Sequence, residues 1–248
     1  MKKHNKPKQI KSTKNDNFIS IIILSDNPGY RMKSYGSIPL ITINNKHLID
    51  LQIEQIKKTF DKYEIILCVG FDASKIAKYI FFKHKKINIR IVENQIFNQS
   101  NSCESVRLSL NNTNNNNILI IDGSLLFSYK SIKMIDPGKN CILTQKHTSE
   151  NLQIGVNTDT NNIVQHFCFG ASKTWSEMLF LNNEAYISCL KKFVSNPENK
   201  KKFFFESLND LAKNKLPIIS IENKNQIYKI DNIKTYHHVR ENHEIFSL

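Results

Sequence analysis

The sequence predicts an α/β protein with a Rossmann-like, mostly parallel mixed sheet that helices flank to give three layers. Apolar runs of strand length, such as residues 19–24 and Tyr63–Val69, are bounded by turn residues and carry too few polar positions for a strand with one face in water. Amphipathic segments of helical period lie between these runs. This alternation is typical of parallel strands joined by right-handed crossovers.

The expected elements follow one another in a regular order. Apolar positions at helical spacing mark the helices, and Gly, Asn or low-complexity stretches separate the elements. They are a strand at 19–24, a short apolar segment at 39–43 with a turn at 44–45, a helix from 47 to 60, a strand at 63–69, a helix at 73–82, a strand at 87–92, a helix at 102–110, a loop at 111–117 and a strand at 118–121. Residues 141–180 are predicted to add further strands.

Length and charge predict one domain that follows a basic arm. The 248 residues suffice for a single α/β domain with a substantial core, placed at residues 18–248. Residues 1–17 hold six lysines and one acid without a periodic apolar pattern, so we expect a disordered arm. Such an arm suits an acidic protein or a nucleic acid as partner, or no particular partner. No RNA-binding or zinc-finger motif accompanies the net charge of +13.

Cysteine usage and hydropathy predict a cytoplasmic protein. The five cysteines are an odd number, widely spaced and without a C-x-x-C pair, which argues against a disulfide framework or a zinc site. No apolar run approaches the ~18 residues that a membrane span requires. The first residues also lack the apolar core of a secretory signal.

The loop after the first strand is the first candidate site. Ser25, Asp26 and Asn27 follow the strand directly, and Gly29 and Arg31 come next. In an open α/β sheet, ligands bind at the carboxyl ends of strands. Asn and Gly tolerate positive φ, so the loop can turn tightly and present backbone N–H groups to an anion, while Arg31 adds a forked cation suited to phosphate. The plainer alternative is a simple turn with an incidental arginine.

Residues 24–32 resemble the opening loop of the GT-A-like nucleotidyltransferases, which act on sugar-1-phosphates and phosphocholine. Their loop has the pattern L-A-A-G-x-G-x-R-M, which Gly29, Arg31 and Met32 match. Further stretches are similar in the same order and spacing between Phe18 and Glu241. These are 43–49 (I-x-G-K-P-L-I), 64–70 (E-I-I-V-V-x-G-Y), 94–106 (N-x-x-Y-x-x-x-N-x-x-x-S), 120–124 (I-I-D-G-D), 205–209 (F-E-x-x-L-N) and 227–231 (W-x-E-I-D).

The resemblance implies transfer of a nucleotidyl group from a nucleoside triphosphate to a phosphorylated acceptor, phosphocholine-like or a sugar phosphate, with release of pyrophosphate. Arg31, Asp122 and Asp231 are the implied catalytic residues, and Asp122 and Asp231 would hold Mg²⁺. The implied nucleotide-binding residues are Ser25, Asp26, Asn27, Gly29, Arg31, Asn101 and Ser105. On the acceptor side we expect Lys173, Trp175 and Glu206, although a lone tryptophan is more often part of a core.

Two departures from the family pattern argue against catalysis. The lysine of its P-K-x-L segment is Ile38 here, and the second aspartate of D-G-D is Ser124. Lys33 and Lys46 are the alternatives for the lysine, although neither stands at the matching place. Each lost electrostatic group is commonly worth ~3–4 kcal/mol in the transition state. The alternative hypothesis is therefore an inactive pseudoenzyme that serves as a nucleotide-binding or protein-interaction module. Ser124 also breaks the D-x-D motif that a related glycosyltransferase would require.

Overall fold

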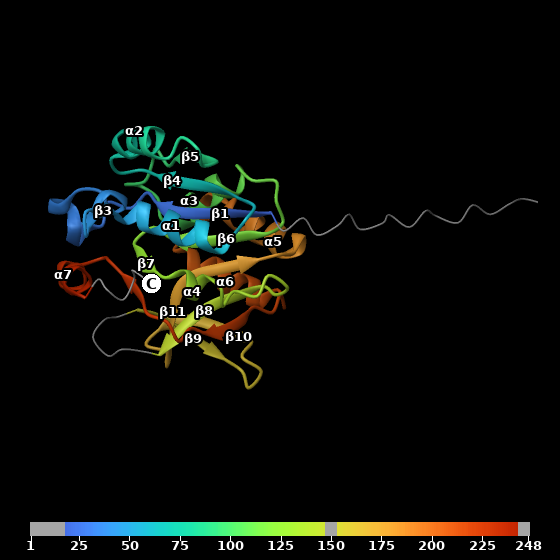
Figure 1. Cartoon of the computed structure of the whole chain (residues 1–248). Coiled ribbons are helices and arrows are strands. Elements are labelled where there is room, and N and C mark those ends of the chain that lie inside the picture. The colour runs from blue at the N-terminus through green and yellow to red at the C-terminus, as the bar shows by residue number, and fades with distance from the viewer. Residues whose placement is uncertain (1–17, 147–152, 243–248) are drawn as a thin grey trace, which may run out of the picture.

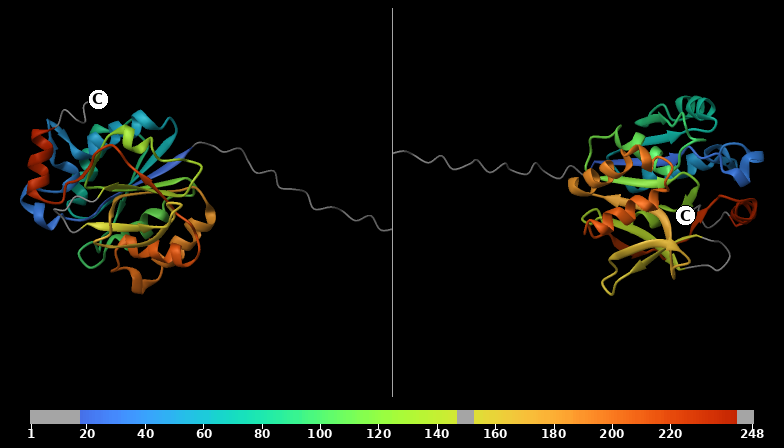
Figure 2. Two further views of the ribbon diagram at one scale, coloured as in Figure 1. Left: turned by 90° about the horizontal axis from the view of Figure 1, so that it is seen from below. Right: turned by 180° about the vertical axis from the view of Figure 1, so that it is seen from behind.

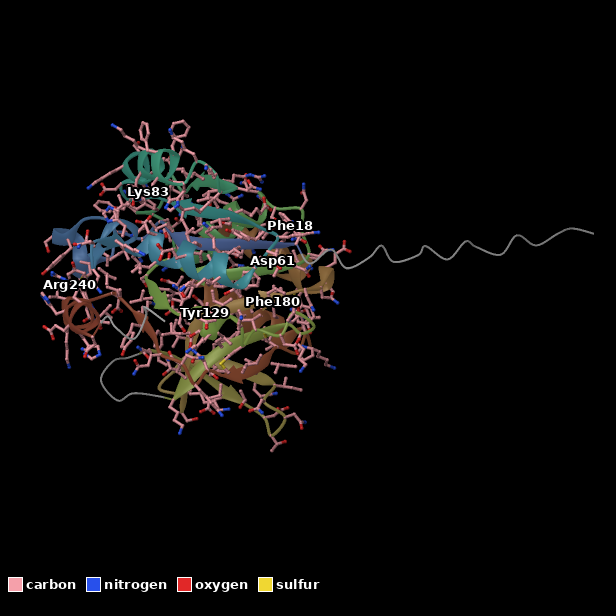
Figure 3. All side chains as sticks on the ribbon, viewed as in Figure 1. Phe18, Asp61, Lys83, Tyr129, Phe180 and Arg240 are labelled. Carbon is pink, nitrogen blue, oxygen red and sulfur yellow. The ribbon has the colours of Figure 1, made fainter. Side chains whose placement is uncertain are left out.

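The computed structural model describes residues 18–146 and 153–242. The predicted basic arm, residues 1–17, lies outside this part of the chain. Figure 1 shows the arrangement of the elements, and Figure 3 adds their side chains. Phe18 and Asp61, which precede β1 and β4, lie at one end of the molecule, and Arg240 on α7 lies at the opposite end (Figure 3).

One nine-stranded sheet runs through the described residues. Its strands follow the order β10-β9-β11-β6-β1-β4-β5, and β8 pairs with both β11 and β12. The segment β6-β1-β4-β5 is parallel, whereas β11 joins β6 in antiparallel orientation. The sheet strands are β1 (Ile19–Ser25), β4 (Tyr63–Val69), β5 (Ile89–Glu93), β6 (Ile118–Asp122), β8 (Cys141–Lys146), β9 (Ile154–Thr158), β10 (Val164–Phe169), β11 (Lys173–Leu181) and β12 (Ile219–Glu222).

Two short antiparallel pairs lie outside the large sheet, β2 with β3 and β7 with β13. Their bounds are β2 (Thr42–Ile43), β3 (Lys46–His47), β7 (Leu125–Phe127) and β13 (Ile227–Lys229). The helices are α1 (Leu48–Thr59), α2 (Ala73–Lys83), α3 (Ser102–Leu110), α4 (Tyr129–Ile132), α5 (Glu184–Val194), α6 (Phe204–Lys213) and α7 (Ile233–Glu241), with 3₁₀ turns η1 (Tyr30–Tyr35), η2 (Ile38–Leu40) and η3 (Pro197–Asn199).

Helices cover both faces of the sheet and give the predicted three layers. Along β1, Ile21 and Ile23 point into a core shared with α1, α2 and α4, and Ile22 points into a core shared with α3, α5 and α6. Figure 2 shows α5 and α6, in orange, on the side of the sheet opposite α1. Because β1 is buried on both faces, its sequence is a continuous apolar run rather than an alternating one.

A third, smaller core joins the loop after β1 to the C-terminal helix α7. Met32, Ile38 and Ile43 are buried in it together with Tyr236 and Val239 of α7. The Tyr236 hydroxyl donates a hydrogen bond to the carbonyl oxygen of Thr42 at 2.9 Å. Both views in Figure 2 place α7, in red, beside the blue segment that follows β1. The segment after β1 and the C-terminal helix, which are far apart in the sequence, therefore pack against each other at the end of the sheet.

The structure confirms the predicted fold class and most of the expected elements. The 63–69 strand and the 102–110 helix have the predicted bounds. The 87–92 strand begins two residues later, at Ile89, and the 39–43 segment divides between η2 and β2. Asn44 and Asn45 form the expected turn with φ of 50° and 63°. No helix in the described ranges is long and apolar enough to cross a membrane.

Candidate active site

A cavity of about 520 Å³ opens at the carboxyl ends of β1 and β6. Its lining includes four acids, Asp26, Asp122, Glu177 and Asp231, and among the described lining residues Lys229 is the one base. Aromatic side chains form much of the rest, namely Phe97, Phe169, Trp175, Phe203, Phe204 and Phe205. The lining of the cavity is thus partly acidic and partly aromatic, and the six aromatic residues are called the aromatic wall below. Asp122, Glu177, Lys229 and Asp231 are called the charged centre below.

The loop after β1 borders this cavity through Asp26, Asn27 and Pro28. The Asn27 side-chain oxygen accepts a hydrogen bond from the N–H of Gly29 at 2.9 Å, and Gly29 has φ of 58°. A Cβ at Gly29 would lie 2.8 Å from Cδ1 of Ile38, so a side chain there would meet both strain and contact. Ile38, at the position of the family's lysine, is therefore packed against the loop backbone and is 5% exposed.

Beneath the loop, Asn94 gathers three of the polar side chains. Its amide nitrogen donates to Asp26 Oδ2 at 3.2 Å and to the hydroxyls of Ser100 and Ser105 at 3.1 Å. Asn94 and Ser105 are fully buried. Burial raises the pKa of Asp26, although hydrogen bonds from Ser105 and Asn94 oppose the shift. The predicted residues Asp26 and Ser105 are thus brought together by a residue that the sequence analysis did not select.

Asp122 ends β6 directly against this loop. The N–H and the hydroxyl of Ser124 both donate to Asp122 Oδ1, at 2.8 and 2.5 Å. Between them, Gly123 donates its N–H to the Leu24 carbonyl at 2.7 Å, and a Cβ there would lie 2.1 Å from the Ser25 hydroxyl oxygen. Only glycine fits this approach. Ser124, which replaces the second family aspartate, therefore orients Asp122 instead of offering a carboxylate.

Glu177 enters the charged centre through the register of β11. Met178 pairs with Ile121 in the antiparallel β11–β6 ladder, which places Glu177 across from Asp122. The β11–β8 register is interrupted between Trp175 and Leu179, and Glu177 has φ of 53°. A left-handed backbone within a strand is uncommon for a residue with a side chain and costs of order 1–3 kcal/mol. The strain is located where the chain turns this carboxyl into the cavity.

Lys229 is held opposite Glu177 by a different pair of strands. It pairs with Leu125 in the β13–β7 ladder, and the N–H of the next residue, Ile230, donates to the Ser124 carbonyl at 2.9 Å. The ammonium group of Lys229 forms an ion pair with Glu177. The turn that begins at Asp122 and the strand that carries Lys229 are therefore one hydrogen-bonded unit.

The pKa values of Asp122, Glu177 and Lys229 are shifted by their burial and by one another. Burial alone would raise the pKa of Asp122, but Lys229 and the Ser124 hydrogen bonds outweigh it, so the pKa is lowered and the carboxylate stays ionised. Burial raises the pKa of Glu177 to about 7 despite Lys229. Burial acts to lower the pKa of Lys229, but Glu177 and Asp122 reverse that effect and raise it, with a smaller contribution from Asp231. Lys229 therefore remains a cation.

The other predicted nucleotide-binding residues have mixed positions. Asn101 lines the cavity and caps α3, accepting a hydrogen bond from Ser102 N–H at 2.8 Å. Ser25 is buried, with its hydroxyl group packed against Gly123. Gly29 and Arg31 are not among the described residues that line the cavity, and Arg31 is exposed on η1. Asp231 does line it, and accepts a hydrogen bond from the Asn232 amide at 2.7 Å.

The predicted acceptor residues do not form one group. Trp175 lines the cavity, is 5% exposed, and donates its indole N–H to the Met178 carbonyl at 3.1 Å. Lys173 lies two residues earlier and donates to the Asn162 side chain at 3.3 Å, apart from the described lining residues. Glu206 accepts a hydrogen bond from Phe203 N–H at 2.9 Å and so caps α6. Its carboxylate has a structural partner that explains its presence.

Sequence reasoning missed two members of the charged centre, Glu177 and Lys229. Each carried a signal in the sequence. Glu177 is the one acid in β11, where Lys173 is the only other charged residue, and Lys229 is the charged last residue of the short strand β13. Lys229 also stands where the W-x-E-I-D pattern has glutamate. A partly buried charged side chain in a strand generally has a charged or hydrogen-bonding partner elsewhere in the fold.

Comparison with solved structures defines the class of fold. The chain is similar to the CTP:phosphocholine cytidylyltransferase LicC of Streptococcus pneumoniae, with 20% identity, a TM-score of 0.75, and coverage of 90% of this chain and 98% of that one. The inositol-1-phosphate CTP transferase of T. maritima has 12% identity, a TM-score of 0.72, and coverage of 87% and 90%. HddC of Yersinia pseudotuberculosis has 15% identity, a TM-score of 0.71, and coverage of 90% and 99%. The fold is that of the nucleotidyltransferases, which confirms the resemblance at the level of fold.

Sequence comparison assigns the chain to a family. The family described as "Domain of unknown function (DUF6564)" matches residues 40–184, more than half of the chain, and this protein belongs to it. No curated protein matches the sequence.

Proposed function

We propose that this protein is a divergent nucleotidyltransferase. In the reaction, a phosphate oxygen of the acceptor attacks the α-phosphorus of a nucleoside triphosphate. The bond from that phosphorus to the oxygen bridging to the β-phosphate breaks, and pyrophosphate leaves. The acceptor is a phosphorylated small molecule, phosphocholine-like or a sugar phosphate. In such a reaction, the protein contributes chiefly by positioning the reactants and by neutralising their charge.

The observation that supports this proposal is the position of the cavity. It lies at the carboxyl ends of β1 and β6, where open α/β sheets bind ligands, and it joins the loop of Asp26 and Asn27 to Asp122 and Asp231. The proposed nucleotide side comprises this loop with Gly29, Arg31, Asn101 and Ser105. The aromatic wall with Trp175 forms the proposed acceptor side. Lys173 and Glu206 stay a prediction as acceptor contacts.

The resemblance implies Mg²⁺ held by Asp122 and Asp231, and this too stays a prediction. As the structure stands, the ammonium group of Lys229 lies among the carboxylates that would hold such an ion, and it pairs with one of them. Among the described residues, no group of three or more His, Cys, Asp or Glu side chains is arranged to hold a metal ion. Asp122 Oδ1 already accepts a hydrogen bond from the Ser124 hydroxyl, and the ammonium group of Lys229 forms an ion pair with Glu177. We therefore derive no catalytic step through a metal.

Calorimetric titration of the purified full chain with CTP, UTP, ATP and GTP tests the proposal. Binding of one nucleotide, weakened by Arg31→Ala and Asp231→Ala, is expected. Asp136→Ala is the matched control, because Asp136 is an exposed acid that pairs with Lys139 at 3.0 Å away from the cavity. Pyrophosphate release is then measured with phosphorylated acceptors. Failure to bind any of the four nucleotides overturns the proposal.

The second candidate is a pseudoenzyme that binds a nucleotide or a protein without turnover. Two observations favour it, the burial of Ile38 where the family has lysine and the presence of Lys229 where it has glutamate. Nucleotide binding without pyrophosphate release for any acceptor would support this candidate. The cytoplasmic location and an acidic protein or nucleic-acid partner for residues 1–17 stay predictions.

A further inference from the structure

Lys229 is a cation set among the acids of the cavity by the architecture of the chain. Its side chain is 31% exposed and pairs with Glu177, whose side chain is 16% exposed. The β11–β6 register places Glu177 across from Asp122, and the β13–β7 register carries Lys229 to the same point. Three segments distant in sequence therefore converge on one ion pair, which a solvated surface lysine would not require.

The ammonium group compensates more than one carboxylate. It forms an ion pair with Glu177, and the carboxylates of Asp122 and Asp231 line the same cavity. An ammonium is a compact point charge with three donors, so it suits a site where several oxygens converge. No second base is found among the described residues that line the cavity. Lys229 is thus the source of positive charge within this part of the site.

A divalent ion and the ammonium compete for one place. Mg²⁺ requires near-octahedral oxygen ligands at about 2.0–2.1 Å. The carboxylates available for it are those of Asp122, Glu177 and Asp231; Glu177 already pairs with Lys229, and Asp122 Oδ1 already accepts a hydrogen bond from Ser124. An ion bound there would also lie beside a like charge in a partly buried site, where repulsion is poorly screened. A divalent ion bound at the carboxylate of Glu177 therefore displaces the ammonium group of Lys229.

We propose that Lys229 is the resident cation of the charged centre, replaces a divalent metal ion there, and lets the site hold the phosphates of a nucleotide without metal. The nucleotide part of this inference rests on the proposed function. The metal part does not, because it concerns the protein without ligand. With a lysine where the W-x-E-I-D pattern has glutamate, this set of carboxylates includes a cation of its own, paired with Glu177.

Direct titration with Mn²⁺ tests the metal part. The full chain is titrated while free Mn²⁺ is followed by electron paramagnetic resonance, and thermal melting is compared in Mg²⁺ and in EDTA. The wild type is expected to bind no Mn²⁺ at the cavity and to melt at the same temperature in both buffers. Lys229→Glu is expected to gain one Mn²⁺ site and to melt higher in Mg²⁺ than in EDTA. Lys130→Glu, the same charge change at an exposed position of α4, is the control and should gain neither.

The nucleotide part is tested with the nucleotide that binds. Its affinity for the wild type should differ by less than about threefold between Mg²⁺ and EDTA, and Lys229→Gln should weaken it by about 10- to 100-fold, the usual effect of losing a charge-assisted contact. Lys229→Arg keeps a cation at this position and should retain most of the affinity. Retention by Lys229→Arg separates a charge role from general damage to the fold.

Each outcome decides a different statement. Metal-dependent nucleotide binding by the wild type, or a wild-type Mn²⁺ site lost in Asp122→Asn, overturns this inference and leaves the proposed function standing. Absence of binding for every nucleotide in both buffers overturns the proposed function, and the Mn²⁺ titrations still decide the role of Lys229. If Lys229→Glu does not fold in EDTA, refolding in Mg²⁺ supports the inference, whereas failure in both buffers together with a wild-type Mn²⁺ site contradicts it.

Discussion

The loop after β1 and the charged centre border the same cavity, yet they differ in where charge is placed. On the loop side, the position of the family's lysine is Ile38, packed against Gly29 and 5% exposed. On the other side, a lysine stands where the family pattern has glutamate, and it pairs with Glu177. Among the described residues that line the cavity, the positive charge therefore lies in the charged centre and not in the loop after β1.

The difference follows from what each position offers an ammonium group. Around Ile38 lie Met32, Ile43 and Tyr236 of the third core, which supply no carboxylate. At Lys229, a carboxylate is within ion-pair distance and two more act on it. Burial of an unpaired charge is costly, whereas a paired and hydrogen-bonded charge is tolerated. A homologous position alone therefore does not say where the charge of a site lies.

Ile38→Lys tests the apolar side of this comparison and should have the largest effect. A lysine in the third core lacks a partner, so the free energy of unfolding should fall by about 2–4 kcal/mol in urea denaturation. Ile38→Leu, which keeps volume and polarity, should lose less than about 1.5 kcal/mol. Undiminished stability of Ile38→Lys together with tighter nucleotide binding would show that the loop side still accepts the family's lysine.

A double-mutant cycle between Lys229 and Glu177 tests the charged side. Lys229→Met and Glu177→Gln should each lower the free energy of unfolding by about 1–3 kcal/mol, a range reduced because both side chains keep some solvent contact. The double variant should recover part of the loss, with a coupling energy of about 1–2 kcal/mol. Strictly additive losses in urea denaturation would mean that the pair contributes no specific stability.

Asn94→Ala tests the network that supports the loop. Its removal leaves Asp26, Ser100 and Ser105 without a shared donor, so stability should fall by about 1–2 kcal/mol and nucleotide affinity should fall with it. Asn214→Ala removes an exposed amide at the end of α6 and serves as the control. Equal stability losses in the two variants, measured by thermal melting, would argue against a special role for Asn94.

Lys46→Ala should have the smallest effect. Lys46 is near the family's lysine in sequence, but it pairs with Glu54 at 2.8 Å and both side chains are exposed. An exposed ion pair contributes about 0–1 kcal/mol, so stability should change little and nucleotide affinity should not change. A clear loss of nucleotide affinity in calorimetry would instead identify Lys46 as a substitute for the lysine missing at Ile38.

Much of the fold can be predicted because its signals are local. The apolar runs of β1, β4 and β6 and the helical period of α1 to α3 each lie within one short window of sequence. The strands β7 and β13 are different. They have three residues each and exist through pairing with one another across a long stretch of chain, which no local pattern announces.

The candidate site divides in the same way. The loop after β1 and Asp122 follow predicted strands, so their approach at one sheet edge can be expected from topology. Glu177 depends on a cross-strand register, an interrupted ladder and a left-handed backbone, none of which periodicity reveals. The position of Lys229 likewise depends on the pairing of β13 with β7. The sequence thus predicts one half of the cavity, and long-range pairing decides the other half.

The pairing of β13 with β7 also sets an order of events during synthesis. On the ribosome, Asp122 and Glu177 emerge well before Lys229, and α7 follows later still. Because a domain generally folds as a unit, the structure cannot be complete until this last segment has been made. A chain that stops before β13 lacks both the cation that pairs with Glu177 and the helix that covers the third core. The described residues from β13 onward therefore complete the charge and the burial of segments made much earlier.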